Sequence, residues 1–125
     1  YTAWLAVPRA LRFLRELGTE RLREHETRVV AAASEALPAA GAQPIAPPSM
    51  SAAMRAFLLP QRRPATDADA AEVIRTLWDR ERIQIRCARI GAWLLLRVCA
   101  QAYVDCEEML ALGAALGRHG WPGRS

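Results

Sequence analysis

Helical periodicity dominates the N-terminal part of the chain. Apolar residues recur at spacings of three and four over residues 8–17, with arginines on another face, which predicts a helix there. Gly18 suits the end of this helix, and Thr19 is placed to cap a second helix that stops before Pro38. The Pro- and Ala-rich residues 38–49 predict a connecting loop.

Strand patterns follow in the second half of the chain. Residues 54–59 read as one strand that Pro60 ends. Apolar and polar residues then alternate over residues 83–87, and a second apolar run covers residues 93–99. The residues between them, 89–92, include glycine and predict the turn of a β-hairpin.

Two capping boxes predict the starts of two further helices. Thr66 with Asp69 precedes a helix to about Arg80, and Asp105 with Glu108 precedes the last helix. The resulting order, α-α-β-α-β-β-α, predicts an α+β fold in which helices pack on one side of a small, mostly antiparallel sheet.

Composition narrows the chemistry available to the chain. All 17 basic residues are arginines, and the formal net charge is +4 over 125 residues. The absence of lysine excludes a Schiff-base lysine and a phosphate-loop lysine within this sequence. No segment has the length or hydrophobicity of a membrane span or a secretion signal, so we expect a cytoplasmic chain with no membrane partner.

The sulfur and imidazole side chains do not form a metal-binding pattern. Cys87, Cys99 and Cys106 are an odd number of cysteines without the spacing of a ligand pair, and His25 and His119 lie far apart in the sequence. We therefore predict no metal site and reduced cysteines.

Arg97 is the most informative single residue. It lies in an otherwise apolar strand, on the same face as Trp93 and Leu95. A guanidinium on an inward face needs an anion, and its planar fork suits a carboxylate. Two alternatives remain open at this point: this face is exposed to solvent, or Arg97 pairs with a local acid such as Asp105.

Other candidate residues have structural explanations. Glu107 and Glu108 diverge on a helix and are explained by the helix dipole at its first turn. The arginines of the first helix alternate with glutamates and lack an aromatic platform, so we predict a solvated face and no nucleic-acid partner. No catalytic residue is predicted within the chain.

Several segments resemble a known family when they are taken together and in order. They are Thr2–Pro8 with Ala10–Gly18, Ala52–Pro60, Arg82–Ile85, Trp93–Tyr103 and Glu107–Leu116. This set resembles the C-terminal segment of class V aminotransferase-fold enzymes, most closely the isopenicillin N epimerase-like branch.

The resemblance implies a pyridoxal-phosphate-dependent enzyme of fold type I, usually a homodimer with active sites at the subunit interface. Residues 1–125 would form its C-terminal small domain, with residues 1–18 as the connecting helix from a missing large domain. The family's small domain supplies an arginine for the substrate α-carboxylate, and Arg97 occupies that place in the motif. The Schiff-base lysine and the cofactor-binding residues belong to the large domain, so this chain would be inactive alone and would hold no cofactor-binding residue.

The reaction stays open within this interpretation. Epimerisation, C–S lysis, desulfuration and transamination of an amino acid all use the same carboxylate contact. A second function, from a different class, is a free-standing α+β binding or regulatory module whose arginine-rich surface holds an anionic partner.

Overall fold

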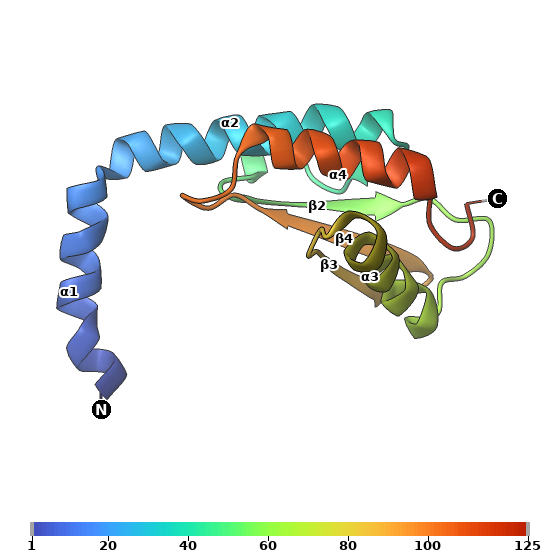
Figure 1. The fold of residues 1–125 in the computed structure, drawn as a ribbon, viewed down its shortest axis with the longest axis horizontal. Helices are drawn as coiled ribbons and strands as arrows, with labels where there is room; N and C mark the ends of the chain where they lie inside the picture. Colours follow the sequence, from blue (N-terminus) through green and yellow to red (C-terminus); the bar gives the residue numbers. More distant parts are fainter. Residues whose placement is uncertain (1, 125) are drawn as a thin grey trace.

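An antiparallel sheet with helices on one of its faces makes up most of the structure (Figure 1). The computed structural model describes residues 2–124; Tyr1 and Ser125, which the predicted domain includes, lie outside the described residues. The elements are α1 (Thr2–Leu17), α2 (Thr19–Ala39), β1 (Gln43–Pro44), a 3-10 turn η1 (Pro48–Met50), β2 (Met54–Leu59), α3 (Asp67–Glu81), β3 (Arg86–Ile90), β4 (Trp93–Cys99) and α4 (Cys106–His119). The predicted α+β class and the order α-α-β-α-β-β-α are confirmed, with two short additions after α2.

The strands lie in the order β1-β2-β4-β3, and every neighbouring pair is antiparallel. Strand β4 is therefore flanked on both sides. In this register Arg97 lies between Ala56 of β2 and Arg86 of β3. Side chains alternate between the two faces of a strand, so these three residues share one face.

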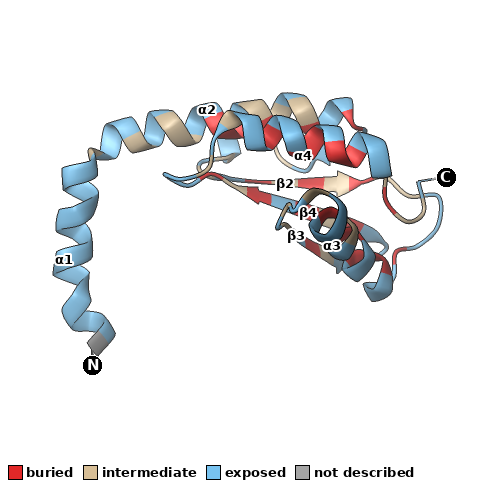
Figure 2. Ribbon diagram, in the orientation of Figure 1, coloured by how far each residue is buried: buried red, intermediate tan, exposed pale blue. Residues whose placement is uncertain are grey.

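The opposite face of the sheet carries the hydrophobic core. Phe57 and Leu59 of β2 and Leu94 and Leu96 of β4 have no exposed surface. Helices α2, α3 and α4 bury their apolar residues in the same cluster, which Figure 2 shows as the buried parts that face the sheet. Burying one large aliphatic side chain contributes about 1.5–3 kcal/mol, so this layer stabilises the fold.

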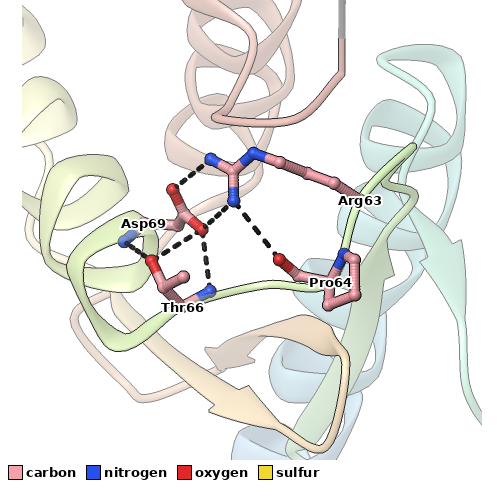
Figure 3. Close-up of polar contacts among 4 residues, drawn as sticks. All are labelled: Arg63, Pro64, Thr66 and Asp69. Carbon is pink, nitrogen blue, oxygen red and sulfur yellow. Dashed lines mark hydrogen bonds and ion pairs between the residues drawn. The ribbon is translucent and has the colours of Figure 1, made fainter.

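The start of α3 is held by a polar cluster (Figure 3). The Thr66 hydroxyl accepts from the Asp69 backbone N–H at 3.2 Å, and the Asp69 carboxylate accepts from the Thr66 N–H at 2.7 Å, so the predicted capping box is confirmed. Arg63 adds a bidentate contact, with its two Nη atoms 2.7 and 2.8 Å from the carboxylate oxygens. This hydrogen bonding from Arg63 and Thr66 holds the pKa of Asp69 well below its usual range.

Each of the two N-terminal helices contains a proline, although the sequence pattern predicts that the first helix begins at Pro8 and that the second ends before Pro38. Helix α1 begins well before residue 8, so Pro8 lies inside it, and α2 includes Pro38 in its last turn. A proline removes one backbone donor, and the helix-favouring residues around it outweigh that loss here. The predicted cap is also wrong, because Gly18 (φ 85°) precedes α2 without a side-chain cap and Thr19 is already helical.

Helix α1 extends away from the sheet, as Figure 1 shows, and its apolar side is exposed. Trp4 and Leu5 each keep 79% of their surface accessible. Within residues 2–124, no helix has the length and hydrophobicity needed to cross a membrane.

Strand β3 begins later than the alternating pattern predicts. Arg82 takes the left-handed conformation (φ 58°) at the end of α3, and the Ile83 N–H bonds the Leu77 carbonyl at 3.1 Å. Residues 83–85 are therefore held near the helix end and do not pair with β4. Their alternation reflects side chains that pack against the core cluster, as Ile83 and Ile85 do.

Candidate functional site

Arg97 lies on the face of the sheet that the helices leave uncovered. Arg97 is exposed, whereas its neighbours Leu96 and Val98 point into the core. The sequence left two alternatives to an inward Arg97: exposure to solvent or pairing with Asp105. In the structure of this chain, Arg97 is exposed to solvent. The other does not occur, because Asp105 caps α4 by accepting from the Glu108 N–H at 2.9 Å.

A second arginine, Arg86, lies directly opposite Arg97 on β3. Among residues 2–124, neither guanidinium makes a hydrogen bond or ion pair with another side chain. By contrast, Arg89 of the same strand pairs with Asp67 at 3.0 Å. Like charges directly opposite each other on a sheet are destabilising, so this pair is an unsatisfied positive site.

Sequence reasoning missed Arg86 as a site residue because it treated residues 83–87 as an ordinary alternating strand. The predicted β-hairpin was the feature of the sequence that could have identified Arg86. A turn at Gly91 and Ala92 pairs Ile90 with Trp93, and the same antiparallel register then brings Arg86 opposite Arg97.

Both arginines line an open groove of about 910 Å³. It lies where residues 82–85, just before β3, leave the end of β4 unpaired, and the first turns of α4 form another wall. Its apolar lining includes Ile83, Ile85, Val98, Val104 and Met109.

The charge of this groove is positive. Arg82 also lines it and stacks on Trp78, with the guanidinium carbon 5.6 Å from the ring centroid. Glu108 is the acidic side chain among the described lining residues, and its carboxylate already accepts from the Asp105 N–H at 2.9 Å. The groove therefore offers two free guanidinium groups beside apolar surface, which suits a small organic anion.

A third arginine, Arg55, lies on the buried face of β2, and sequence reasoning missed it. Its residue is only 6% exposed, and its two Nη atoms donate to the Ser34 hydroxyl and, at 3.1 Å, to the Ala46 carbonyl. Its Nε has no partner among the described residues, and the guanidinium lies 5.9 Å from the centre of the Phe57 ring. Alternation with Phe57 and Leu59 was the signal for its inward position. These contacts connect β2 to α2 and to the loop after it, which is a structural role.

Cys99 lines the same groove as the arginine pair, whereas Cys87 is buried and the two histidines have other partners. Burial raises the pKa of the Cys87 thiol to about 11, so it carries no thiolate near neutral pH. His25 is half-buried, with Nε2 2.7 Å from the Val104 carbonyl oxygen. His119 contacts Glu81 at 2.6 Å. No group of three or more potential metal ligands is present in residues 2–124.

Comparison with known proteins gives two relatives with the same description. The chain is 39% identical over 116 residues to an isopenicillin N epimerase of Amycolatopsis lactamdurans and 35% identical over 116 residues to an isopenicillin N epimerase of Streptomyces clavuligerus. Each alignment covers 90% of this chain but 28% of the relative. No family model matches the sequence.

These matches test the resemblance drawn from the sequence motifs. They extend over nearly the whole chain, as the set of motif segments does, and both relatives carry the name of the branch that those motifs indicate. The chain spans little more than a quarter of the length of these relatives. The chain is thus similar to one part of an isopenicillin N epimerase, and the resemblance predicted from its sequence is confirmed.

Proposed function

We propose that this chain is the C-terminal small domain of a larger pyridoxal-phosphate-dependent enzyme and that Arg97 binds the α-carboxylate of an amino-acid substrate. The observation that carries this proposal is a guanidinium without an acidic partner in residues 2–124, displayed on the uncovered face of the sheet. The similarity to isopenicillin N epimerases supports it, because those proteins are much longer than this chain.

The uncovered face has the character of an interface with more protein. Trp93, Met54 and Ile90 lie on it and are 46%, 50% and 55% exposed. Large exposed apolar patches mark surfaces that bind protein. The apolar side of α1 is exposed as well. We therefore place the remainder of the polypeptide against this face, with a second subunit completing a homodimer.

The residues of this chain do not fit covalent attachment of the cofactor. The sequence contains no lysine, so the remainder of the polypeptide would hold pyridoxal phosphate. When bound, this cofactor withdraws electrons from the substrate Cα and makes one of its bonds labile. Epimerisation, C–S bond cleavage and transamination remain equally compatible with that chemistry.

Arg97 would contribute orientation. Its planar fork forms two parallel hydrogen bonds with a carboxylate, which fixes both the position and the rotation of that group. Fixing the carboxylate also fixes the direction of the remaining Cα bonds. Holding a reactive geometry in this way lowers the entropic part of the barrier.

The test uses the complete polypeptide, obtained by extending the reading frame upstream of Tyr1. In the Arg97→Ala variant we expect KM for the amino-acid substrate to rise about a hundredfold, because a charge-assisted contact is lost. The absorbance of the bound cofactor should stay unchanged, since the cofactor is held elsewhere. Arg75→Ala is the matched control, because Arg75 is an exposed arginine on α3 outside the groove. An unchanged KM in Arg97→Ala would refute the assigned role.

A further inference from the structure

We infer that Arg86 binds a second acidic group on the same ligand, so that the substrate is an amino acid with an acidic side chain. This inference rests on the proposed function, in which Arg97 holds the α-carboxylate. The observation behind it is the direct pairing of Arg86 with Arg97 across β3 and β4.

The sheet geometry sets the spacing of the two sites. Residues directly opposite in an antiparallel pair have Cβ atoms about 4.5–5.5 Å apart and point to the same side. Two guanidinium groups that extend from such positions can contact acidic groups separated by a short methylene chain. An amino acid whose side chain ends in a carboxylate has this arrangement.

Charge balance favours two acidic groups over one. A single carboxylate satisfies one arginine fork through two parallel hydrogen bonds. The other guanidinium would then remain beside the first, with no acidic partner among residues 2–124. A dicarboxylate provides each fork with its own partner and removes the repulsion between Arg86 and Arg97.

The surroundings of the pair also fit such a ligand. Ala88 and Leu95 form the next opposed pair on the same face of β3 and β4 as the two arginines, and both are partly exposed. Methylene groups between two carboxylates would contact this apolar surface while the carboxylates face the guanidinium groups. This face of the sheet thus offers charged and apolar surface side by side, which are the two kinds of group that a dicarboxylic amino acid contains.

The experiment measures ligand binding at low ionic strength to the complete polypeptide, obtained as for the test of the proposed function, in which the remaining polypeptide covers this face. Glutarate and pentanoate are the probes, because they have the same number of carbons but carry two carboxylates and one. Binding is followed from the side-chain N–H signals of the arginines in two-dimensional NMR spectra. We expect glutarate to bind about tenfold more tightly than pentanoate, the gain from one added charge-assisted contact.

Three variants separate the contributions. Arg86→Gln should reduce glutarate affinity to that of pentanoate while pentanoate binding stays unchanged. Arg97→Gln should weaken both ligands. Arg75→Gln, the exposed control on α3, removes the same charge outside the groove and should change neither.

The outcomes distinguish this inference from the proposed function. If glutarate has no advantage, or keeps it in Arg86→Gln, the second acidic site is refuted; pentanoate binding that depends on Arg97 would leave the proposed function intact. If Arg97→Gln changes neither ligand, the carboxylate role of Arg97 itself is refuted. Inorganic phosphate binding as tightly as glutarate would show that both arginines hold one doubly charged anion, and would overturn the dicarboxylic substrate class.

Discussion

Helices α2 and α4 approach each other at Gly113, and this contact gives a sharp test of the packing. A Cβ atom at Gly113 would lie 2.8 Å from the Ala36 Cβ, 2.9 Å from the Ala36 carbonyl oxygen and 3.0 Å from its carbonyl carbon. Non-bonded carbon atoms prefer about 3.5–4.0 Å. Two of these three neighbours are backbone atoms, so no side-chain rotation can relieve the contact.

The expected effect of Gly113→Ala is the sum of two opposing contributions. Alanine is favoured over glycine inside a helix by about 1 kcal/mol. Separating two packed helices to admit a methyl group costs about 3 kcal/mol, at the upper end of overpacking penalties because the obstacle is backbone. The net prediction is a loss of about 2 kcal/mol in the free energy of unfolding.

Gly117 provides the matched control in the same helix. A Cβ there would meet nothing within 4 Å, and the residue is exposed. Gly117→Ala should therefore stabilise the chain by about 0.5–1 kcal/mol through helix propensity alone.

Urea denaturation followed by circular dichroism measures both variants. With an m-value of about 1.5 kcal/mol/M, the Gly113→Ala midpoint should fall by about 1 M relative to the parent chain, whereas the Gly117→Ala midpoint should rise. Combining Gly113→Ala with Ala36→Gly should restore only part of the loss, since the backbone contacts remain. A Gly113→Ala chain that is as stable as Gly117→Ala would refute the close approach of α2 and α4.

Two further predictions concern titratable groups. Hydrogen bonds lower the pKa of Asp69 in the folded state, so its ionised form stabilises the chain above its usual pKa near 3.8, and this contribution disappears as the pH falls below 4. Urea midpoints of the parent chain should therefore fall from pH 6 to pH 3, and Asp69→Asn should reduce that pH dependence; equal slopes would contradict the cluster in Figure 3. Because burial raises the pKa of Cys87 to about 11, iodoacetamide at pH 7.5 should label Cys99 and Cys106 before Cys87 in the folded chain, as peptide mass spectrometry would show. Preferential labelling of Cys87 would contradict its buried position.

The sequence predicted those elements whose signals are local. Both capping boxes form as expected, because each depends only on side chains three residues apart. Strand β2 has the predicted bounds, and so does β4, since apolar strand residues flanked by turn residues leave few alternatives.

Elements that depend on distant contacts were missed or displaced. Strand β1 contains only Gln43 and Pro44, and its existence depends on pairing with Leu58 and Phe57 of β2. The start of β3 depends on the left-handed turn at Arg82, which no apolar pattern reveals. Such contacts arise from tertiary structure, which overrides a local pattern.

The sheet arginines show why burial could not be assigned from the pattern of β4 alone. Both faces of β4 are apolar apart from Arg97, so alternation does not identify the inward face. In the isolated chain, Arg97 determines which face of β4 is exposed, because an unpaired guanidinium is costly to bury. Arg55 on β2 is buried only because Ser34 and Ala46 accept from it.

Arg97 therefore requires an anion in the assembled protein that we propose, where this face is covered, and not in the chain alone. Alone, Arg97 is solvated, and its open neighbours on the sheet include Trp93 and Met54. Covering those side chains with the remaining polypeptide gains about 25 cal/mol for each Å² of apolar surface buried. The same covering layer removes water from Arg97 and Arg86, and two desolvated guanidinium groups are stable together only with acidic partners. Apolar burial at this face and recognition of an acidic ligand are thus coupled, because the surface that favours assembly surrounds the charges that require the ligand.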